Sequence, residues 1–220
     1  MVVSRGFRVS NIRSVVSAVR RYAGELLYER RYHVRTSGRL ILADHDAESI
    51  CYIAVNWRQL RRVLPANSVT TGDVFIDLGS GMGRAVLEAA ATYSFARVIG
   101  VELSRDLHEI AQRNMATTTR RLSCRNIELV CADLRHYRIP DDVTVVFVNN
   151  SVRGSIFTTV LGEISASMER NPRRLRFIYS NPVEDAAVLA TGQWRKVRTI
   201  EPRRSHWPYG VTCVYEWVVR

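Results

Sequence analysis

Residues 75–84 read FIDLGSGMGR, in which an apolar run ends in an aspartate and three glycines follow at alternate positions. Glycine weakens regular structure, so Gly79, Gly81 and Gly83 indicate either a sharp turn or a close approach of the backbone to a ligand. The apolar run predicts a buried strand, and the residues after the glycines predict a helix. A glycine-rich turn between a strand and a helix is typical of doubly wound proteins that bind ligands at strand ends.

The rest of the chain alternates apolar strands with amphipathic helices, which predicts a mostly parallel sheet covered on both faces. Strands are expected at 74–78, 97–101, 127–131, 143–148 and 175–180, and helices at 84–92, 105–118, 155–169 and 184–190. Residues 196–200 and 211–219 are expected to form a closing antiparallel hairpin. We therefore predict an α/β fold with a doubly wound, mostly parallel seven-stranded sheet.

The 220 residues, 46% of them apolar, suffice for one large core with an N-terminal extension. Helical spacing of apolar residues predicts an amphipathic helix over 10–32, and a short helix at about 56–64 ends at Pro65. We predict a helical extension over residues 1–65 and a core domain over 66–220. No acid precedes Glu25, which is also how a mitochondrial presequence reads, but packing on the domain is the simpler interpretation.

The formal net charge of +11 predicts attraction to phosphate backbones. The arginines are scattered along the chain, however, and Lys196 is the only lysine. Solvated arginine faces on a basic protein are therefore the preferred interpretation, and nucleic acid is an open but not favoured partner.

The cysteines and the hydropathy pattern bear on the compartment. Four cysteines without a C-x-x-C pair argue against disulfides or zinc and predict reduced thiols in a cytoplasmic protein. Cys131 stands in an apolar run and is expected to be buried. No apolar window is long enough to cross a bilayer, so no membrane association is expected.

Acids stand at the ends of the next two expected strands. The G-x-G-x-G spacing differs from the G-x-G-x-x-G of dinucleotide folds and lacks the G-K-[ST] ending of phosphate-binding loops. Glu102 ends the second strand, where a carboxylate can accept hydrogen bonds from two ribose hydroxyls. Asp133 follows the third strand, where an acid or its backbone neighbours can hold an adenine amino group. With Asp77 and the glycines, these acids predict a nucleoside ligand without a phosphate requirement, such as S-adenosylmethionine.

The segments FIDLGSGMGR, VIGVELS, CADL and VFVNNS together resemble the class I S-adenosylmethionine-dependent methyltransferases over residues 50–182. Within that class, DLGSGMGR, GVE and FVNN are similar to the non-SET histone lysine methyltransferases of the disruptor-of-silencing type. Bacterial enzymes of unassigned substrate also look alike, with D-L-G-S-G-x-G-R between two further motifs. These are R-Y-x-V-x-T-x-G upstream, here RYHVRTSG at 31–38, and Y-x-N-P-V downstream, here YSNPV at 179–183.

The resemblance implies a Rossmann-like methyltransferase domain over 66–220 and a set of residues that hold S-adenosylmethionine. That set is Asp77, Gly79, Ser80, Gly81, Gly83, Glu102, Leu103, Asp133, Leu134 and Asn149. It also implies that Asn149 and Asn150 face the methyl group and the acceptor as catalytic residues. Tyr52 joins them from a tyrosine-x-proline-threonine segment that closes over the methionine part, although Ala54 and Val55 replace the proline and threonine here.

Methyl transfer from a sulfonium needs mainly proximity and alignment, so neither a nucleophile triad nor a metal site is expected. The N-P-P-[YF] motif of enzymes that methylate base amino groups is missing, which disfavours a nucleobase acceptor. We expect a methyltransferase that acts on a small molecule or a protein side chain by in-line displacement. The alternative is an RNA methyltransferase, or a nucleic-acid-binding protein that keeps a relict cofactor fold.

Overall fold

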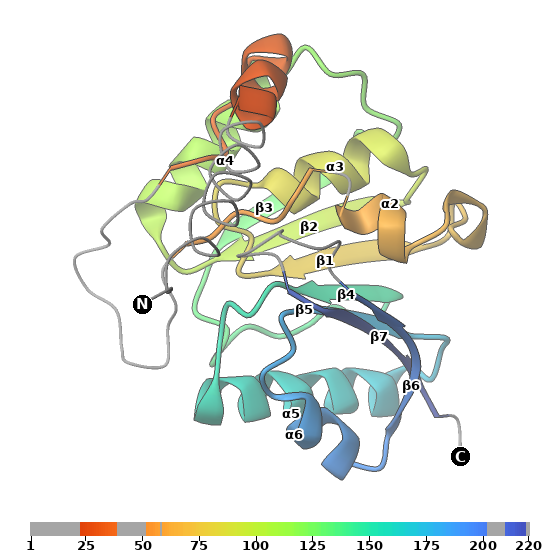
Figure 1. The fold of residues 1–220 in the computed structure, drawn as a ribbon. Coiled ribbons are helices and arrows are strands. Elements are labelled where there is room, and N and C mark those ends of the chain that lie inside the picture. The colour runs from red at the N-terminus through yellow and green to blue at the C-terminus, as the bar shows by residue number, and fades with distance from the viewer. Residues whose placement is uncertain (1–22, 39–51, 58, 202–209, 219–220) are drawn as a thin grey trace, which may run out of the picture.

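The computed structural model describes residues 23–38, 52–57, 59–201 and 210–218. Its centre is a seven-stranded sheet with the order β3-β2-β1-β4-β5-β7-β6 (Figure 1). The strands are β1 Val74–Leu78, β2 Arg97–Glu102, β3 Ile127–Cys131, β4 Val145–Val148, β5 Arg176–Ser180, β6 Trp194–Ile200 and β7 Thr212–Trp217. β1 to β5 run parallel, and β7 runs antiparallel to both β5 and β6. The predicted fold class is confirmed.

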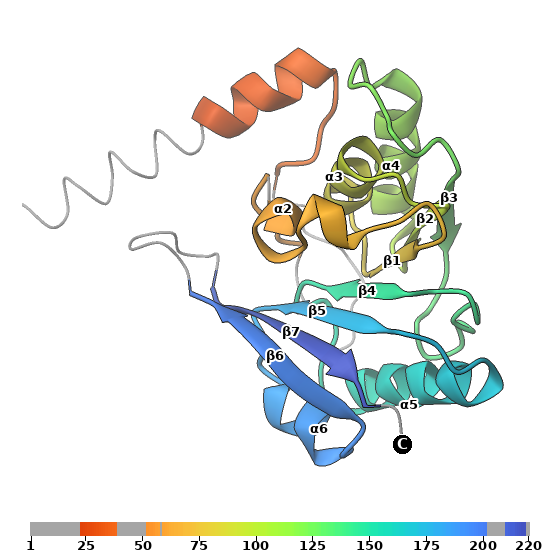
Figure 2. The same ribbon diagram turned by 90° about the vertical axis from the view of Figure 1, so that its right-hand side faces the viewer.

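Helices cover both faces of this sheet (Figure 2). Three helices lie on one face: α2 Gln59–Val63, α3 Arg84–Thr92 and α4 Arg105–Thr117. Two helices lie on the other: α5 Gly154–Arg170 and α6 Asp185–Ala190. A 3-10 turn, η1 Ala66–Ser68, leads into β1. Within the described part of the chain, no helix combines the length and the hydrophobicity that a membrane span requires.

Strand β1 is apolar throughout except for Asp77, because it is covered on both sides. All five of its residues are buried. Ile76 and Leu78 belong to the cluster that includes residues of α5, whereas Phe75 packs with residues of α2 and α3. Side chains alternate along a strand, so Asp77 points to the same side as Phe75. The apolar run of the motif therefore places a single carboxylate beneath the glycine turn and α3.

The element boundaries differ from the predicted ones by a few residues. Residues 23–32 are helical, and the earlier part of the helix predicted over 10–32 lies outside the described residues. β4 begins two residues later than predicted, at Val145, and β6 begins two residues earlier, at Trp194. The extension of β6 is explained by packing, since the Trp194 ring lies 5.6 Å from that of Phe177. The expected division of the chain at Pro65 stays a prediction.

The cysteines are free thiols where they are described, with one departure from the prediction. Cys124 and Cys213 are buried, and Cys51 lies outside the described residues. Cys131 is exposed, so its predicted burial is wrong. The reason is that β3 is the outermost strand on its side of the sheet, and an edge strand is less completely covered than a central one.

Candidate active site

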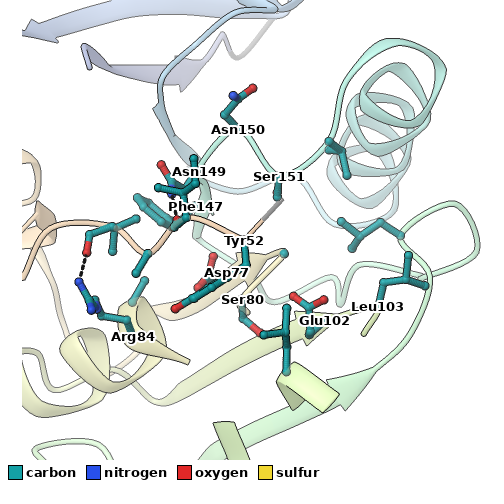
Figure 3. A pocket seen from close by; sticks show the side chains of 18 of the residues that line it. Tyr52, Asp77, Ser80, Arg84, Glu102, Leu103, Phe147, Asn149, Asn150 and Ser151 are labelled. Carbon is teal, nitrogen blue, oxygen red and sulfur yellow. Dashed lines mark hydrogen bonds between the residues drawn. The ribbon is translucent and has the colours of Figure 1, made fainter. Parts of the chain in front are cut away.

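A cavity of about 300 Å³ opens at the carboxyl ends of the parallel strands (Figure 3), where doubly wound sheets bind ligands. It brings together ten of the predicted site residues: Tyr52, Asp77, Gly79, Ser80, Glu102, Leu103, Asp133, Leu134, Asn149 and Asn150. Gly81 and Gly83 do not line the cavity and lie within the turn beside it. Arg84, Arg135 and Ser151 also line it, although they were not among the predicted site residues.

The three glycines are required by the conformation of the turn. Gly79, Gly81 and Gly83 have φ values of 84°, 54° and 81°, in the left-handed region that favours glycine. A Cβ atom at Gly79 would overlap the Ser151 side chain, and one at Gly81 would overlap the Tyr52 ring. The glycines thus serve both the sharp turn and close approach, and here the approaching groups are side chains of the protein.

Tyr52 covers the glycine turn with its ring and is fixed by its hydroxyl. The hydroxyl donates a hydrogen bond to the main-chain carbonyl of Thr36 at 2.8 Å. Burial raises the pKa of the Tyr52 hydroxyl well above its usual value, so the phenol stays protonated at neutral pH. Tyr52 therefore lines the cavity with an aromatic face, and its assigned catalytic role stays a prediction.

Two carboxylates are buried next to the turn. Glu102 is 8% exposed and accepts hydrogen bonds from the Gly81 amide at 2.7 Å and the Ser104 amide at 2.8 Å. Asp77 is 3% exposed. Burial, and secondarily the charge of Glu102, raise the pKa of Asp77 well above its usual value. A cationic ligand in this cavity would favour ionised Asp77, because an opposite charge stabilises a carboxylate.

Asp133 is engaged by its neighbour Arg135. The Asp133 carboxylate accepts a hydrogen bond from the Arg135 Nε atom at 2.9 Å and lies 2.7 Å from its Nη2 atom. The hydrogen bond from Arg135 holds the pKa of Asp133 below its usual value. Asp133 is thus present in the cavity as a charged, paired group, and its contact with an adenine stays a prediction.

The two asparagines after β4 are held differently. Asn149 donates through Nδ2 to the Ile53 carbonyl at 2.9 Å, and its Oδ1 accepts from Asn181 Nδ2 at 3.3 Å. Asn181 Oδ1 accepts in turn from the Gly210 amide at 2.8 Å. This chain of amides fixes the orientation of Asn149. Asn150 and Asn181 both have positive φ values, 50° and 52°, which concentrates backbone strain at this end of the cavity.

Arg84 connects the glycine turn with the N-terminal part of the chain and is only 1% exposed. Its Nε donates to Thr36 Oγ1 at 2.8 Å, Nη1 to the Val55 carbonyl at 2.7 Å, and Nη2 to Ser37 Oγ at 2.6 Å. Two carboxylates supply nearby negative charge: Glu29 lies 3.5 Å from Nη2 and Glu25 lies 3.6 Å from Nη1. The Glu29 carboxylate also accepts from the Thr36 amide at 2.6 Å.

These contacts join two of the sequence motifs. Arg84 is the last residue of D-L-G-S-G-x-G-R, and Thr36 is the threonine of R-Y-x-V-x-T-x-G. The shared presence of both motifs is the signal that could have predicted the contact. The guanidinium also lies over the Trp57 ring, 4.8 Å from its centroid, so charge and stacking act together.

The model of one protein family matches most of the chain. This is "Histone methylation protein DOT1", over residues 42–174. A search of curated proteins finds no match. Within the part of the chain that the structure describes, no group of His, Cys, Asp and Glu side chains could hold a metal ion.

Solved structures of methyltransferases share the fold. An RNA methyltransferase from Salinibacter ruber, in complex with S-adenosyl-L-homocysteine, is 23% identical with a TM-score of 0.53, covering 75% of this chain and 92% of that chain. A SAM-dependent methyltransferase from Aquifex aeolicus is 14% identical with a TM-score of 0.57, over 73% and 90%. The glycopeptide N-methyltransferase MtfA, complexed with sinefungin, is 12% identical with a TM-score of 0.59, over 81% and 90%.

We expect Gly81→Ala to weaken cofactor binding at least about tenfold, because the new methyl group displaces the Tyr52 ring from the turn. Gly162→Ala in α5 is the matched control. A Cβ there meets nothing within 4 Å, so the change should leave binding unaltered and stabilise the helix by about 1 kcal/mol. Titration calorimetry with S-adenosylmethionine and thermal unfolding measure both effects. Equal binding by the two variants would contradict the assigned role of the turn.

We expect Asp77→Asn to stabilise the free protein while weakening cofactor binding. The folded-state pKa of Asp77 is raised, so the native state binds more protons than the unfolded state between about pH 4 and that pKa. Stability of the parent protein therefore falls as pH rises through this window, and the substitution removes the loss. The gain should be small near pH 4 and increase as pH rises toward 8, as measured by urea unfolding. A variant less stable than the parent near pH 8 would refute this.

We expect Arg84→Gln to cost about 3–5 kcal/mol, because it leaves the Glu29 carboxylate buried without its counter-ion. Adding Glu29→Gln should recover part of that loss, since the more deeply buried of the two carboxylates that face Arg84 is then uncharged. A double-mutant cycle by urea unfolding measures the coupling between the two residues. Strict additivity of the two single changes would show that the contact carries no interaction energy.

Proposed function

We propose an amine of a small molecule or of a protein side chain as the methyl acceptor of this chain, which belongs to the histone methylation protein DOT1 family and is a class I S-adenosylmethionine-dependent methyltransferase. The single observation that carries the proposal is the chemistry of the cavity end formed after β4 and β5. Amide side chains from Asn149, Asn150 and Asn181 stand there.

The polar groups of the cavity are divided between its two ends. The acids Asp77, Glu102 and Asp133 belong to β1, β2 and the loop after β3, and they suit the ribose, the adenine and the positive charges of the cofactor. The end after β4 instead combines amides with apolar side chains such as Val152 and Ile156. Burial among apolar groups disfavours an ammonium ion, so an amine that enters this end is favoured in its neutral, nucleophilic form.

The bound cofactor supplies a methyl carbon on a positively charged sulfur. The acceptor nitrogen forms the new C–N bond with its lone pair as the C–S bond breaks, and the electrons of that bond stay on sulfur. The methylated amine then loses its surplus proton to water. Asn149 and Asn150 are suited to accept the N–H groups of the amine through Oδ1. Alignment of this kind is worth about 7–11 kcal/mol of barrier in well-oriented systems.

The residues that follow the asparagines support an acceptor other than a nucleobase. Ser151 donates to the Leu78 carbonyl at 2.6 Å, and Val152 is buried. Of the described residues that line the cavity, only Tyr52 and Phe147 are aromatic, and Phe147 is fully buried in the sheet. A base taken into an active site is normally held between aromatic or apolar faces and read at its polar edge. Among the described residues that line the cavity, no free aromatic face stands after β4 to hold one.

The net charge of +11 points to the kind of molecule that carries the amine. Long-range repulsion slows the approach of a lysine-rich partner and favours a neutral or acidic one. The family description names histones, which supports a protein side chain as acceptor class. The charge further favours a lysine on an acidic surface over one within a basic tail.

RNA is the second candidate acceptor, and the net charge of +11 favours it. A structural neighbour is also an RNA methyltransferase. Transfer of label from S-adenosylmethionine distinguishes the candidates when the purified chain is offered amine metabolites, acidic or basic lysine peptides, and total RNA. We expect label in amines and acidic peptides, with less in basic peptides at low salt. Label only in an RNase-sensitive fraction would replace the proposal with the RNA alternative.

We expect Asn181→Asp to slow methyl transfer about tenfold, which is the effect of one lost hydrogen bond. Cofactor affinity should stay within about twofold of the parent value. An aspartate can still accept from the Gly210 amide but cannot donate to Asn149 Oδ1, so it frees the orientation of Asn149. Asn126→Asp is the matched control. It makes the same chemical change at an exposed asparagine that donates to the Ala96 carbonyl. Equal kcat values for the two variants would argue against the amide chain.

A further inference from the structure

A second cavity, of about 580 Å³, lies between residues 26–35 and the face of α4 that carries Ile110 and Asn114. We call it the N-terminal groove. It shares no lining residue with the candidate active site. Asn114 of α4 forms part of its wall and donates to the carbonyls of Met82 and Arg35 at 2.8 and 2.7 Å. The groove is therefore backed by the glycine turn.

Three exposed arginines line the groove with little compensation. In the described part of the chain, the side chains of Arg30 and Arg35 form neither an ion pair nor a hydrogen bond. Among the acids that the structure describes, Arg113 pairs with Glu109 alone, one helical turn away, at 3.9 Å, with both side chains about half exposed or more. An exposed contact of this kind contributes little. The groove therefore presents three cationic groups to solvent.

The acid that lines the groove is already engaged. Glu29 is 8% exposed, and its Oε1 atom accepts from the Thr36 amide and hydroxyl at 2.6 and 2.8 Å. The same atom lies 3.5 Å from the Arg84 guanidinium. Glu29 thus neutralises Arg84 inside the protein and does not offset the arginines of the groove.

Some arginines elsewhere on the surface are paired with two acids at once. Arg97 lies 2.8 Å from Asp142 and 3.1 Å from Glu128. Arg170 similarly contacts two carboxylates, each within 2.9 Å. None of the three groove arginines contacts two carboxylates in this way among the described residues. Their positive charge is therefore available to an anion from outside.

We propose that the N-terminal groove binds the sugar–phosphate backbone of a nucleic acid. Guanidinium groups bind phosphate oxygens in a bidentate geometry, and a nucleic acid presents charge densely enough to meet three arginines in one groove. Arg31 and Arg120 lie over the Tyr32 ring at 5.6 and 5.5 Å, which extends the basic surface beside it. The isoelectric point of about 10.1 is typical of nucleic-acid-binding domains.

The placement of the groove separates this partner from the methyl acceptor. The glycine turn and α4 stand between the two cavities, so phosphates held in the groove lie outside the end that carries the asparagines. The nucleic acid recruits the protein to a location, and the amine to be methylated reaches the active site separately. Binding and methyl transfer can therefore be measured independently.

The test compares two variants of the full chain that lose the same charge. The groove triple is Arg30→Gln, Arg35→Gln and Arg113→Gln, and the control triple is Arg174→Gln, Arg195→Gln and Arg198→Gln toward the β6 edge. Fluorescence anisotropy is recorded with single-stranded RNA and duplex DNA of about 20 nucleotides over a salt series from about 50 mM. A polyglutamate peptide serves as competitor, and thermal unfolding checks that both triples fold.

We expect the groove triple to lose at least about tenfold in affinity, with a salt dependence reduced by about two to three phosphate contacts. The control triple should lose less than about threefold, the effect of net charge alone. The probe that binds more tightly, RNA or DNA, identifies the natural source of the phosphates. Absence of binding at low salt, or equal losses in both triples, would overturn the proposal. If polyglutamate displaced the labelled probe as effectively as unlabelled nucleic acid does, an acidic peptide would replace nucleic acid as the proposed partner.

Discussion

The main chain at Gly81 is the point on which the rest of the site depends. Its amide donates to Glu102, and the space a side chain would fill is taken by the Tyr52 ring. The Tyr52 hydroxyl in turn reaches the Thr36 carbonyl. The end of β2 and two N-terminal segments therefore meet at one residue that has no Cβ atom. Their positions are interdependent because Glu102 and Tyr52 both contact this residue and Tyr52 in turn holds Thr36. The left-handed conformation of Gly81 also makes any other residue there strained.

Local patterns predicted the parts of the molecule whose cause is local. The apolar run before Gly79 predicted β1, and the alternation of strands and helices predicted the sheet. Glu102 was expected in the same ligand site as the glycines because it ends the next strand. The role of Arg84 was not predicted, since it depends on contacts with Thr36 and Val55, 48 and 29 residues away. No period or spacing in the sequence encodes such contacts, and the only available signal was the joint occurrence of the two motifs that contain Arg84 and Thr36. Cys131 was misjudged because apolarity does not reveal which strand lies at an edge.

The buried acids Asp77 and Glu102 reduce the stability of the folded state but suit a ligand-binding site. Asp77 and Glu102 have the same sign and little exposure, an arrangement that raises the pKa of Asp77 and disfavours the ionised folded state. A neutral pair would make a more stable core. The arrangement would become favourable with a cation in the cavity, such as the sulfonium or ammonium group of S-adenosylmethionine. The site is therefore suited electrostatically to a positively charged ligand.

The buried contact between Arg84 and Glu29 is best explained by the orientation that it imposes on its partners rather than by its contribution to stability. Replacing a buried ion pair by apolar residues is often neutral or stabilising, so attraction alone does not account for it. An apolar contact, however, would allow residues 33–38 to slide along α3 with little change in energy. The planar guanidinium donates in fixed directions, so it permits only one arrangement of the Thr36 hydroxyl, the Ser37 hydroxyl and the Val55 carbonyl. That arrangement fixes the Thr36 carbonyl where the Tyr52 hydroxyl needs it, and so sets the wall of the cavity.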